Sequence, residues 1–297
     1  MIYIDNSATT KQYPQVTETM MKYMEEYFGN PSSMYQLGLD SEKAVKHARK
    51  QVEEAMGAGN GTLIFTSGGT EADNTAIFGA ARALRRRGNR IITSAVEHPA
   101  VLECCKRLEQ DGYDVVYVGV DDKCRLDLEQ LEDAIDENTI LVSLMQVNNE
   151  AGTIMPVDAV KDLMKKKNVP GWFHCDAVQS FGKLQVPESA DLISVSSHKI
   201  HGPKGAGALF VRKGIHLPAL IEGGGQESGN RSGTENVPAI TGFGTAAELS
   251  AKDRDEERQR VSVMRRALLK GLKDNLEDLR INSVEEDGVE SGQCCSS

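Results

Sequence analysis

Short apolar runs alternate with helix-like segments through the middle of this chain, from Thr62 to Val211. Runs of this kind, bounded by glycine and polar residues, are typical of buried strands. The alternation predicts an α/β fold with a mostly parallel seven-stranded sheet and helices on both faces. In such sheets ligands bind beyond the carboxyl ends of the strands. We expect the strands at residues 62–66, 90–94, 114–120, 140–145, 172–175, 191–195 and 207–211.

Further helices are expected on both sides of this central region. Residues 1–13 indicate an N-terminal arm, and residues 14–27 carry apolar side chains at helical spacing. A second helix is expected from Ser41, whose hydroxyl suits an N-cap, to Met56. Residues 238–274 are expected to be mostly helical.

The composition excludes several classes of protein. The chain has 297 residues, of which 39% are hydrophobic, enough for the core of one large domain or two modest ones. Its net charge of −10 argues against a nucleic-acid partner, which would require an excess of Lys and Arg. No apolar run is long enough for a membrane helix, and Met1 begins a strand-like segment rather than a signal peptide. Six cysteines without paired spacing indicate a reducing compartment, which we take to be the cytoplasm.

A lysine with an unusual setting follows one of the expected strands. Residues 194–205 read Ser-Val-Ser-Ser-His-Lys-Ile-His-Gly-Pro-Lys-Gly, which places Lys199 among hydroxyls and imidazoles. A lysine in such a place can form a Schiff base when its surroundings lower its pKa. A lysine on a surface turn is an equally good reading of this stretch alone.

An aspartate at the end of the preceding strand favours the Schiff base. Asp176 comes directly after the apolar run that ends at Cys175, so it and Lys199 are expected at the same sheet edge. Enzymes that use pyridoxal 5′-phosphate (PLP) need a carboxylate against the pyridine nitrogen, which keeps the ring an electron sink. Asp176 alone could equally be a helix N-cap.

A glycine turn adds an expected phosphate site. Residues 67–69, Ser-Gly-Gly, connect a strand to a helix that opens at Thr70, so backbone amides at the helix N-terminus would face an anion. Taken alone, this turn is weak evidence.

Eight short motifs follow one another along the chain. They are YIDNSATT at 3–10, FGNPSS at 28–33, FTSGGTEADN at 65–74, EH at 97–98, VNNE at 147–150, DAVQS at 176–180, SHK at 197–199 and RSGT at 231–234. With these motifs in this order the chain resembles the cysteine desulfurases, and the resemblance runs from Met1 to about Leu249. It implies a PLP-dependent transferase fold of type I.

The resemblance implies a role for each matching residue. Lys199 would bind PLP and move protons, His98 would stack on the ring and assist proton transfer, and Asp176 would tune the ring. Asn149 would hydrogen-bond cofactor or substrate, and Gln179 would reach the phenolic oxygen of PLP. The residues that would hold the phosphate are Gly69, Thr70, Ser196, His198 and Thr234.

Assembly and partners are also implied by the resemblance. The glycine-rich loop at 223–234 would cross the interface of a homodimer and bring Thr234 to the phosphate of the other subunit. The substrate would be L-cysteine, and the sulfur would pass to a carrier or an iron–sulfur scaffold protein.

The resemblance weakens after Leu249. The segment from Ser291 to Ser297 looks like the loop that carries the nucleophilic cysteine, with Cys295 in the nucleophile's place. The strands expected before this loop are missing, and the arginine that would grip the substrate carboxylate has no counterpart. We therefore expect a PLP-binding large domain at 1–249, a shortened small domain at 250–297, and weak turnover.

Other functions remain open at this point. A related PLP lyase, such as a selenocysteine lyase, or an aminotransferase would share most motifs, although Cys295 argues against an aminotransferase. A PLP-binding protein without turnover would fit the shortened small domain. An inert tail is as good a reading of Cys294 and Cys295 as a catalytic one.

Overall fold

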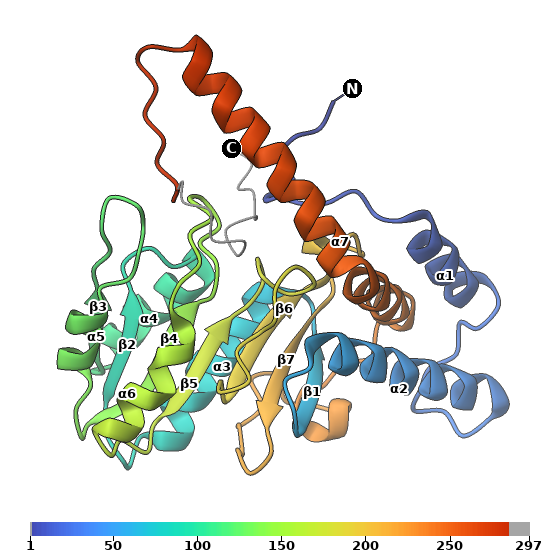
Figure 1. Ribbon diagram of the computed structural model, residues 1–297. Helices are drawn as coiled ribbons and strands as arrows, with labels where there is room; N and C mark the ends of the chain where they lie inside the picture. Colours follow the sequence, from blue (N-terminus) through green and yellow to red (C-terminus); the bar gives the residue numbers. More distant parts are fainter. Residues whose placement is uncertain (1, 285–297) are drawn as a thin grey trace.

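The computed structural model describes residues 2–284 of the chain. A seven-stranded sheet forms the centre of this part, in the order β1-β7-β6-β5-β4-β2-β3 (Figure 1). Neighbouring strands from β3 to β6 pair in parallel, whereas β7 is antiparallel to β1 and β6. The predicted fold, an α/β structure with a mostly parallel sheet, is confirmed. The strands are β1 Gly61–Thr66, β2 Arg90–Ser94, β3 Asp114–Val118, β4 Thr139–Met145, β5 Trp172–Asp176, β6 Leu192–Ser196 and β7 Gly207–Arg212.

Helices cover both faces of the sheet, because successive side chains of a strand point to opposite faces. Ile91 packs with residues of α3 and α4, whereas its neighbour Ile92 packs in the larger core on the other face. That larger core also receives side chains from α2, α5, α6 and the first half of α7. The strands therefore read as continuous apolar runs. The helices are α1 Pro14–Glu25, α2 Gln36–Met56, α3 Gly69–Leu84, α4 Pro99–Gln110, α5 Leu128–Ala134, α6 Val160–Lys166 and α7 Val237–Asn275, with short 3-10 turns η1 Val157–Ala159, η2 Ser197–Lys199 and η3 Glu227–Gly229.

The start of α2 differs from the prediction. The helix begins at Gln36 rather than at Ser41, and Ser41 is buried inside it. The Ser41 hydroxyl donates to the carbonyl oxygens of Leu37 at 3.1 Å and Tyr27 at 3.2 Å. A serine that bonds back to the preceding turn in this way is compatible with a helix interior, so its hydroxyl was wrongly assigned to a cap.

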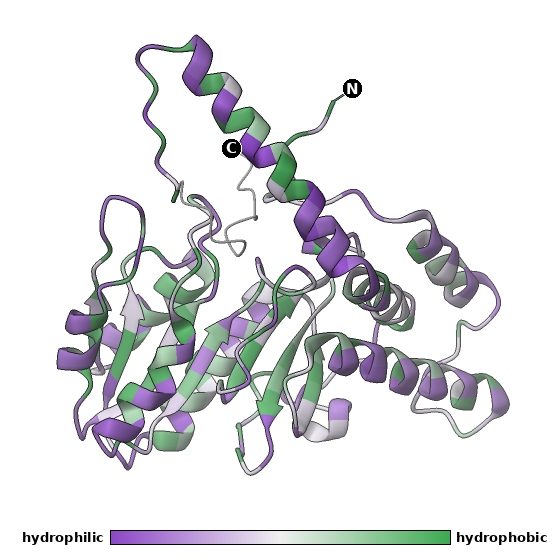
Figure 2. Ribbon diagram, in the orientation of Figure 1, coloured by the Kyte–Doolittle hydropathy of each residue, from purple (hydrophilic) through white to green (hydrophobic). Residues whose placement is uncertain are grey.

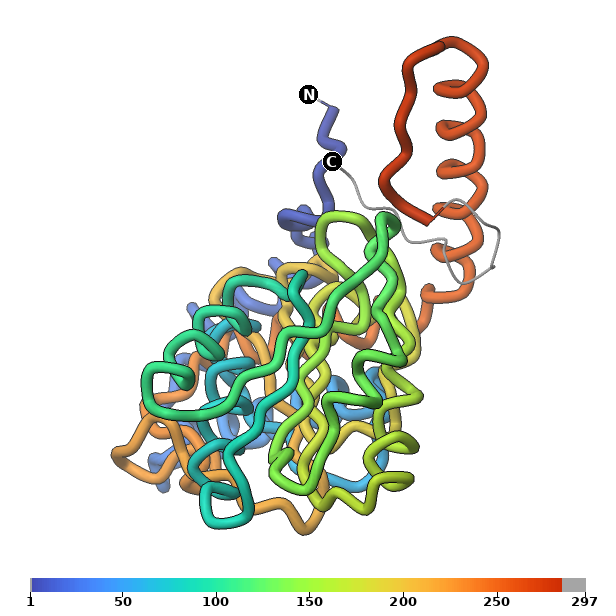
Figure 3. Tube along the Cα trace, turned by 90° about the vertical axis from the view of Figure 1, so that its left-hand side faces the viewer, coloured from blue at the N-terminus to red at the C-terminus, as the bar shows by residue number. Residues whose placement is uncertain are grey.

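The last helix, α7, is 39 residues long and has two halves with different surroundings. Its first half packs on α1 and α2, whereas its second half extends away from the sheet (Figures 1 and 3). Val263, Met264 and Leu268 on that second half are exposed, and apolar residues alternate with polar ones along it (Figure 2). The predicted domain boundary at residues 249 and 250 falls inside α7 and stays a prediction.

None of the helices described between residues 2 and 284 combines the length and the apolar character needed to cross a bilayer.

Candidate active site

A cavity of about 570 Å³ lies at the carboxyl ends of the parallel strands, where the topology places ligands. The turn after β1, the end of β5 and the end of β6 all contribute to its wall. It brings together nine of the residues that the sequence nominates for the site. They are Gly69, Thr70, His98, Asn149, Asp176, Gln179, Ser196, His198 and Lys199.

The turn between β1 and α3 has the shape of an anion site. Gly68 adopts φ 156° and ψ −180°, a conformation that side chains disfavour, and the Thr66 hydroxyl donates to its carbonyl at 2.9 Å. A Cβ on Gly69 would stand 2.7 Å from Cγ2 of Val178, so this position leaves no room for a side chain. The first backbone amides of a helix have no partner within it, and the first two residues of α3, Gly69 and Thr70, line the cavity, which suits a phosphate.

Lys199 ends the 3-10 turn that follows β6, and its amine meets backbone oxygen atoms rather than a carboxylate. Its Nζ donates to the carbonyls of Ser7 and, at 3.1 Å, Ala8. Burial lowers the pKa of Lys199, although the charges of Asp176, Asp5 and Glu150 act in the opposite direction. A lowered pKa makes the amine a better nucleophile at neutral pH.

The N-terminal arm closes over this lysine. The backbone amide of Thr10 donates to the carbonyl of His198 at 2.9 Å, and the Thr10 hydroxyl accepts from the amide of His201 at 2.7 Å. Gln179 also donates to the carbonyl of Ser7, at 3.1 Å. The arm therefore forms part of the cavity wall through Asp5, Ser7 and Ala8, to which the sequence analysis gave no role although they lie in its first motif.

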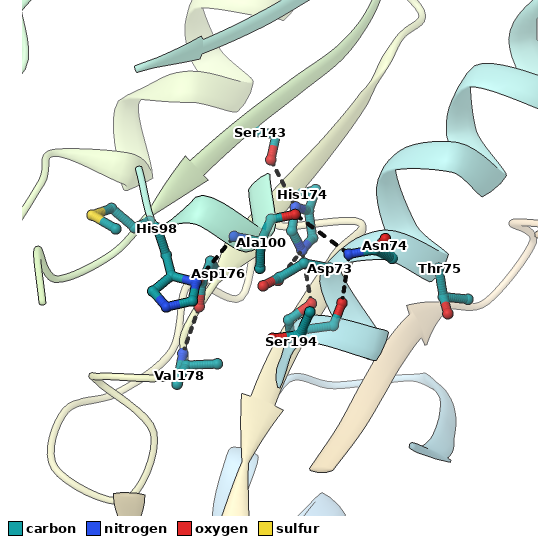
Figure 4. A network of polar contacts seen from close by, with 12 residues as sticks. Asp73, Asn74, Thr75, His98, Ala100, Ser143, His174, Asp176, Val178 and Ser194 are labelled. Carbon is teal, nitrogen blue, oxygen red and sulfur yellow. Dashed lines mark hydrogen bonds and ion pairs between the residues drawn. The ribbon is translucent and has the colours of Figure 1, made fainter. Parts of the chain in front are cut away.

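Asp176, at the end of β5, is buried beside His98 (Figure 4). Its Oδ1 accepts a hydrogen bond from the amide of Val178 at 2.9 Å. Burial raises the pKa of Asp176, and this hydrogen bond together with the nearby charges of His98 and Lys199 offsets part of the increase. A buried carboxylate is stabilised by a cationic partner, such as a protonated ring nitrogen.

His98 is the N-cap of α4 as well as a wall of the cavity. Its Nδ1 accepts from the amide of Ala100 at 3.1 Å. Nδ1 therefore needs its lone pair for the cap, and any proton on the neutral ring belongs on Nε2.

His198 lies on the same 3-10 turn as Lys199. Its Nδ1 lies 3.1 Å from the hydroxyl of Thr9. Burial, together with the charges of Lys199, Lys204 and Lys183, lowers the pKa of His198 to about 4. The ring is therefore neutral at physiological pH and can offer a hydrogen bond, but no charge, to a phosphate.

The comparisons with known proteins assign the family. The Aminotransferase class-V family model matches residues 2–295. The chain belongs to this family.

Members of the family resemble the chain along most of its length. Cysteine desulfurase IscS of Clostridium botulinum is 42% identical over 288 residues, which cover 96% of this chain and 72% of that protein. The solved structure of a NifS-like protein superposes with a TM-score of 0.88 at 40% identity and covers 92% of this chain and 76% of that one. A structure of SspA in complex with cysteine gives a TM-score of 0.78 at 37% identity, with 84% and 72% covered.

As a member of the class-V family the chain is PLP-dependent, and the cavity fits that cofactor. Its volume admits a phosphorylated pyridine. In the turn at residues 67–70, the phosphate turn, Gly69 approaches Val178 so closely that any Cβ there would collide with it. Lys199 offers an amine of lowered pKa, and Asp176 offers a buried carboxylate. The donor set thus matches the aldehyde, the ring nitrogen and the phosphate of PLP.

A further group of buried polar residues adjoins the cavity, which one of them, Asp73, also lines; it was missed from the sequence. His174 of β5 contacts the hydroxyls of Ser143 at 2.8 Å and Ser194 at 2.9 Å, and Asp73 of α3 lies 3.6 Å from its Nε2 (Figure 4). Burial lowers the pKa of His174 to about 3 and raises that of Asp73. Two sequence signals could have revealed this group: His174 stands inside an apolar run, and Asp73 lies on the apolar face of the helix that became α3.

Glu97 belongs to the same group of buried polar residues. It accepts hydrogen bonds from the Ser94 hydroxyl at 2.6 Å and the Met145 amide at 2.8 Å. Burial raises the pKa of Glu97 to about 8. Glu97 lies in the Glu97-His98 motif, but its sequence position alone gave no sign of this buried role.

One described residue nominated from the sequence, Thr234, does not line this cavity. Thr234 is exposed, so in this subunit it lies away from the site, and its role in a partner's site stays a prediction. Cys294 and Cys295 lie outside the described residues.

Proposed function

We propose that this chain is a PLP-dependent cysteine desulfurase, which converts L-cysteine to L-alanine and keeps the sulfur as a persulfide. The observation that supports it most is that Lys199, Asp176 and two residues of the phosphate turn at 67–70, Gly69 and Thr70, line one cavity. The desulfurases among its relatives and the SspA complex with cysteine support the choice of substrate.

The described residues divide the chemistry between them. When bound, PLP supplies an aldehyde carbon that combines with amines and a ring that withdraws electrons. Lys199 holds the cofactor and takes the proton from Cα of cysteine, for which its lowered pKa suits it. His98 keeps a proton on Nε2 because its Nδ1 caps α4. Asp176 keeps the ring nitrogen protonated.

Sulfur transfer requires a thiolate. We assign this role to Cys295, whose sulfur forms a bond to the sulfur of the substrate while the Cβ–S bond breaks. The electron pair of that bond stays with the carbon, which takes a proton and becomes the methyl group, and a proton returned to Cα completes L-alanine. The persulfide on Cys295 then passes its terminal sulfur to a carrier or an iron–sulfur scaffold protein.

We further infer that the chain acts as a homodimer. Large apolar side chains are exposed on the N-terminal arm and on the segment joining α1 to α2, among them Ile2, Ile4, Phe28 and Met34. A surface of this kind is expected where a partner covers it, and the exposed Thr234 would then reach the partner's phosphate site. Light scattering of the purified protein tests this inference, and a stable monomer with a full complement of PLP would contradict it.

We also infer that the chain works in the cytoplasm. All four described cysteines are free thiols, in keeping with a reducing compartment.

Production of L-alanine from L-cysteine, with a reductant present, tests the desulfurase proposal. We expect alanine and sulfide in equal amounts, and loss of both in Lys199→Ala. Lys204→Ala is a matched control, since Lys204 is an exposed lysine on the same stretch. If the chain binds PLP but forms no alanine, the desulfurase proposal is refuted. The remaining explanation is then a PLP-binding protein without turnover. Alanine formed from selenocysteine but not from cysteine would instead support a selenocysteine lyase.

A further inference from the structure

A half-buried ion pair, Glu71–Arg231, lies beside the phosphate turn and is not part of the cavity wall. Glu71, in the first turn of α3, accepts from the amide of Ser67 at 2.8 Å. Arg231, from the glycine-rich loop, donates to the same carboxylate from Nε at 2.9 Å and from Nη2 at 3.2 Å. The Glu71 side chain is 11% exposed and that of Arg231 is 25% exposed, so water screens the pair only in part.

Glu71 carries a negative charge in this position. Burial would raise its pKa, but hydrogen bonds from Arg231 and Ser67 outweigh burial and lower it. Glu71 directly follows Thr70, which lines the cavity at the expected phosphate position. An ionised carboxylate next to a dianionic phosphate opposes binding of the phosphate, unless a cation neutralises the carboxylate.

A second pair of the same kind ties the loop to the same strand. Glu227, with only 3% of its side chain exposed, accepts from Arg49 at 2.7 and 2.8 Å and from the amide of Phe65 at 3.0 Å. Glu227 therefore accepts from the amide of Phe65 within β1, the edge strand of the sheet, and Glu71 accepts from the amide of Ser67, which directly follows β1. The Arg49–Glu227 pair also holds the glycine-rich loop, but it contacts β1 at Phe65 and not the phosphate turn.

We propose that Arg231 is a positioning residue for the cofactor phosphate, because it neutralises Glu71 and so keeps the turn at residues 67–70 in a form that accepts a dianion. Arg231 acts through Glu71 and the Ser67 amide, without lining the cavity. The inference requires PLP to bind in this cavity but does not depend on the desulfurase reaction. Failure of turnover would therefore leave it intact.

Binding of PLP and of pyridoxal, which has no phosphate, separates this role from a purely structural one. Trp172 is the single tryptophan and lies in β5, so quenching of its fluorescence can report both ligands in the apoprotein. We expect Arg231→Met to weaken PLP binding by about tenfold. This is the effect expected when the Glu71 carboxylate, left without its cation, repels the PLP phosphate through partly screened surroundings. Pyridoxal binding should stay within about twofold of the original, since it carries no phosphate for Glu71 to repel.

Three further variants make the test decisive. Glu71→Gln should bind PLP at least as tightly as the original chain, and the double variant Glu71→Gln/Arg231→Met should recover most of the affinity lost in Arg231→Met. Arg49→Met removes the matched arginine from Glu227 and should lower thermal stability without a selective loss of PLP over pyridoxal. Equal weakening of PLP and pyridoxal in Arg231→Met, no weakening at all, or no recovery in the double variant would each overturn the proposal.

Discussion

Glu97→Gln should change how the stability of the apoprotein depends on pH. Glu97 is buried, and burial raises its pKa from the usual 4.5 to about 8, with a smaller contribution from the charge of Asp176. Between these two values the folded chain binds more protons than the unfolded chain, so stability falls as pH rises and levels off above about pH 8. Glutamine has nearly the same shape and does not titrate.

The expected magnitude follows from the width of that window. Each pH unit inside it costs about 1.4 kcal/mol, and the slope halves near pH 8, so about 2 kcal/mol should be lost between pH 6 and pH 8. Glutamine can keep the local contacts, because its oxygen can accept from the Met145 amide while its NH₂ donates to the Ser94 hydroxyl. The loss should therefore be nearly absent in Glu97→Gln.

Urea denaturation of both apoproteins at pH 6, 7 and 8 measures this difference. Work near pH 5 is best avoided because the isoelectric point is about 5.2 and low net charge promotes aggregation. The stability of the original chain relative to Glu97→Gln should fall by about 2 kcal/mol from pH 6 to pH 8. A difference that stays constant over that range would show that Glu97 ionises normally and that burial does not control it.

Further predictions concern the phosphate turn and the core. Gly69→Ala should weaken PLP binding by about tenfold, because its Cβ would meet Val178 at 2.7 Å. Gly271→Ala, in an open part of α7, is its control and should leave PLP binding unchanged while raising helix stability. Phe243→Ala should lower the free energy of unfolding by about 3–5 kcal/mol, because it removes a fully buried ring packed edge-on against Phe65 and Phe181. Denaturation midpoints would check this, and a loss under about 1 kcal/mol would contradict the packing.

The strands could be predicted from the sequence because of how they are buried. β4 is buried along its whole length and β2 nearly so, which leaves short apolar runs with sharp ends. Helix ends were less predictable. Ser41 resembles a cap in sequence, but α2 begins at Gln36, and the Ser41 hydroxyl donates to the carbonyls of Leu37 and the distant Tyr27.

The candidate site was predictable where several residue types together point to one chemistry. Lys199 and Asp176 are each ambiguous alone, but both follow predicted strands, and the parallel topology brings them to one edge. The arm that closes over Lys199 could not be inferred, since it uses the backbone carbonyls of Ser7 and Ala8, 192 and 191 residues away. Main-chain contacts leave no signature in side-chain identity.

Reduction of the PLP-loaded protein with borohydride, followed by peptide mass mapping, tests the central claim most directly. Borohydride fixes the cofactor covalently to the amine that holds it. We predict one added phosphopyridoxyl mass per chain, located on the peptide that contains Lys199, together with complete loss of alanine production in the reduced protein. A label on another lysine, or no label on a protein that still forms alanine from cysteine, would contradict the assignment of this cavity as the active site.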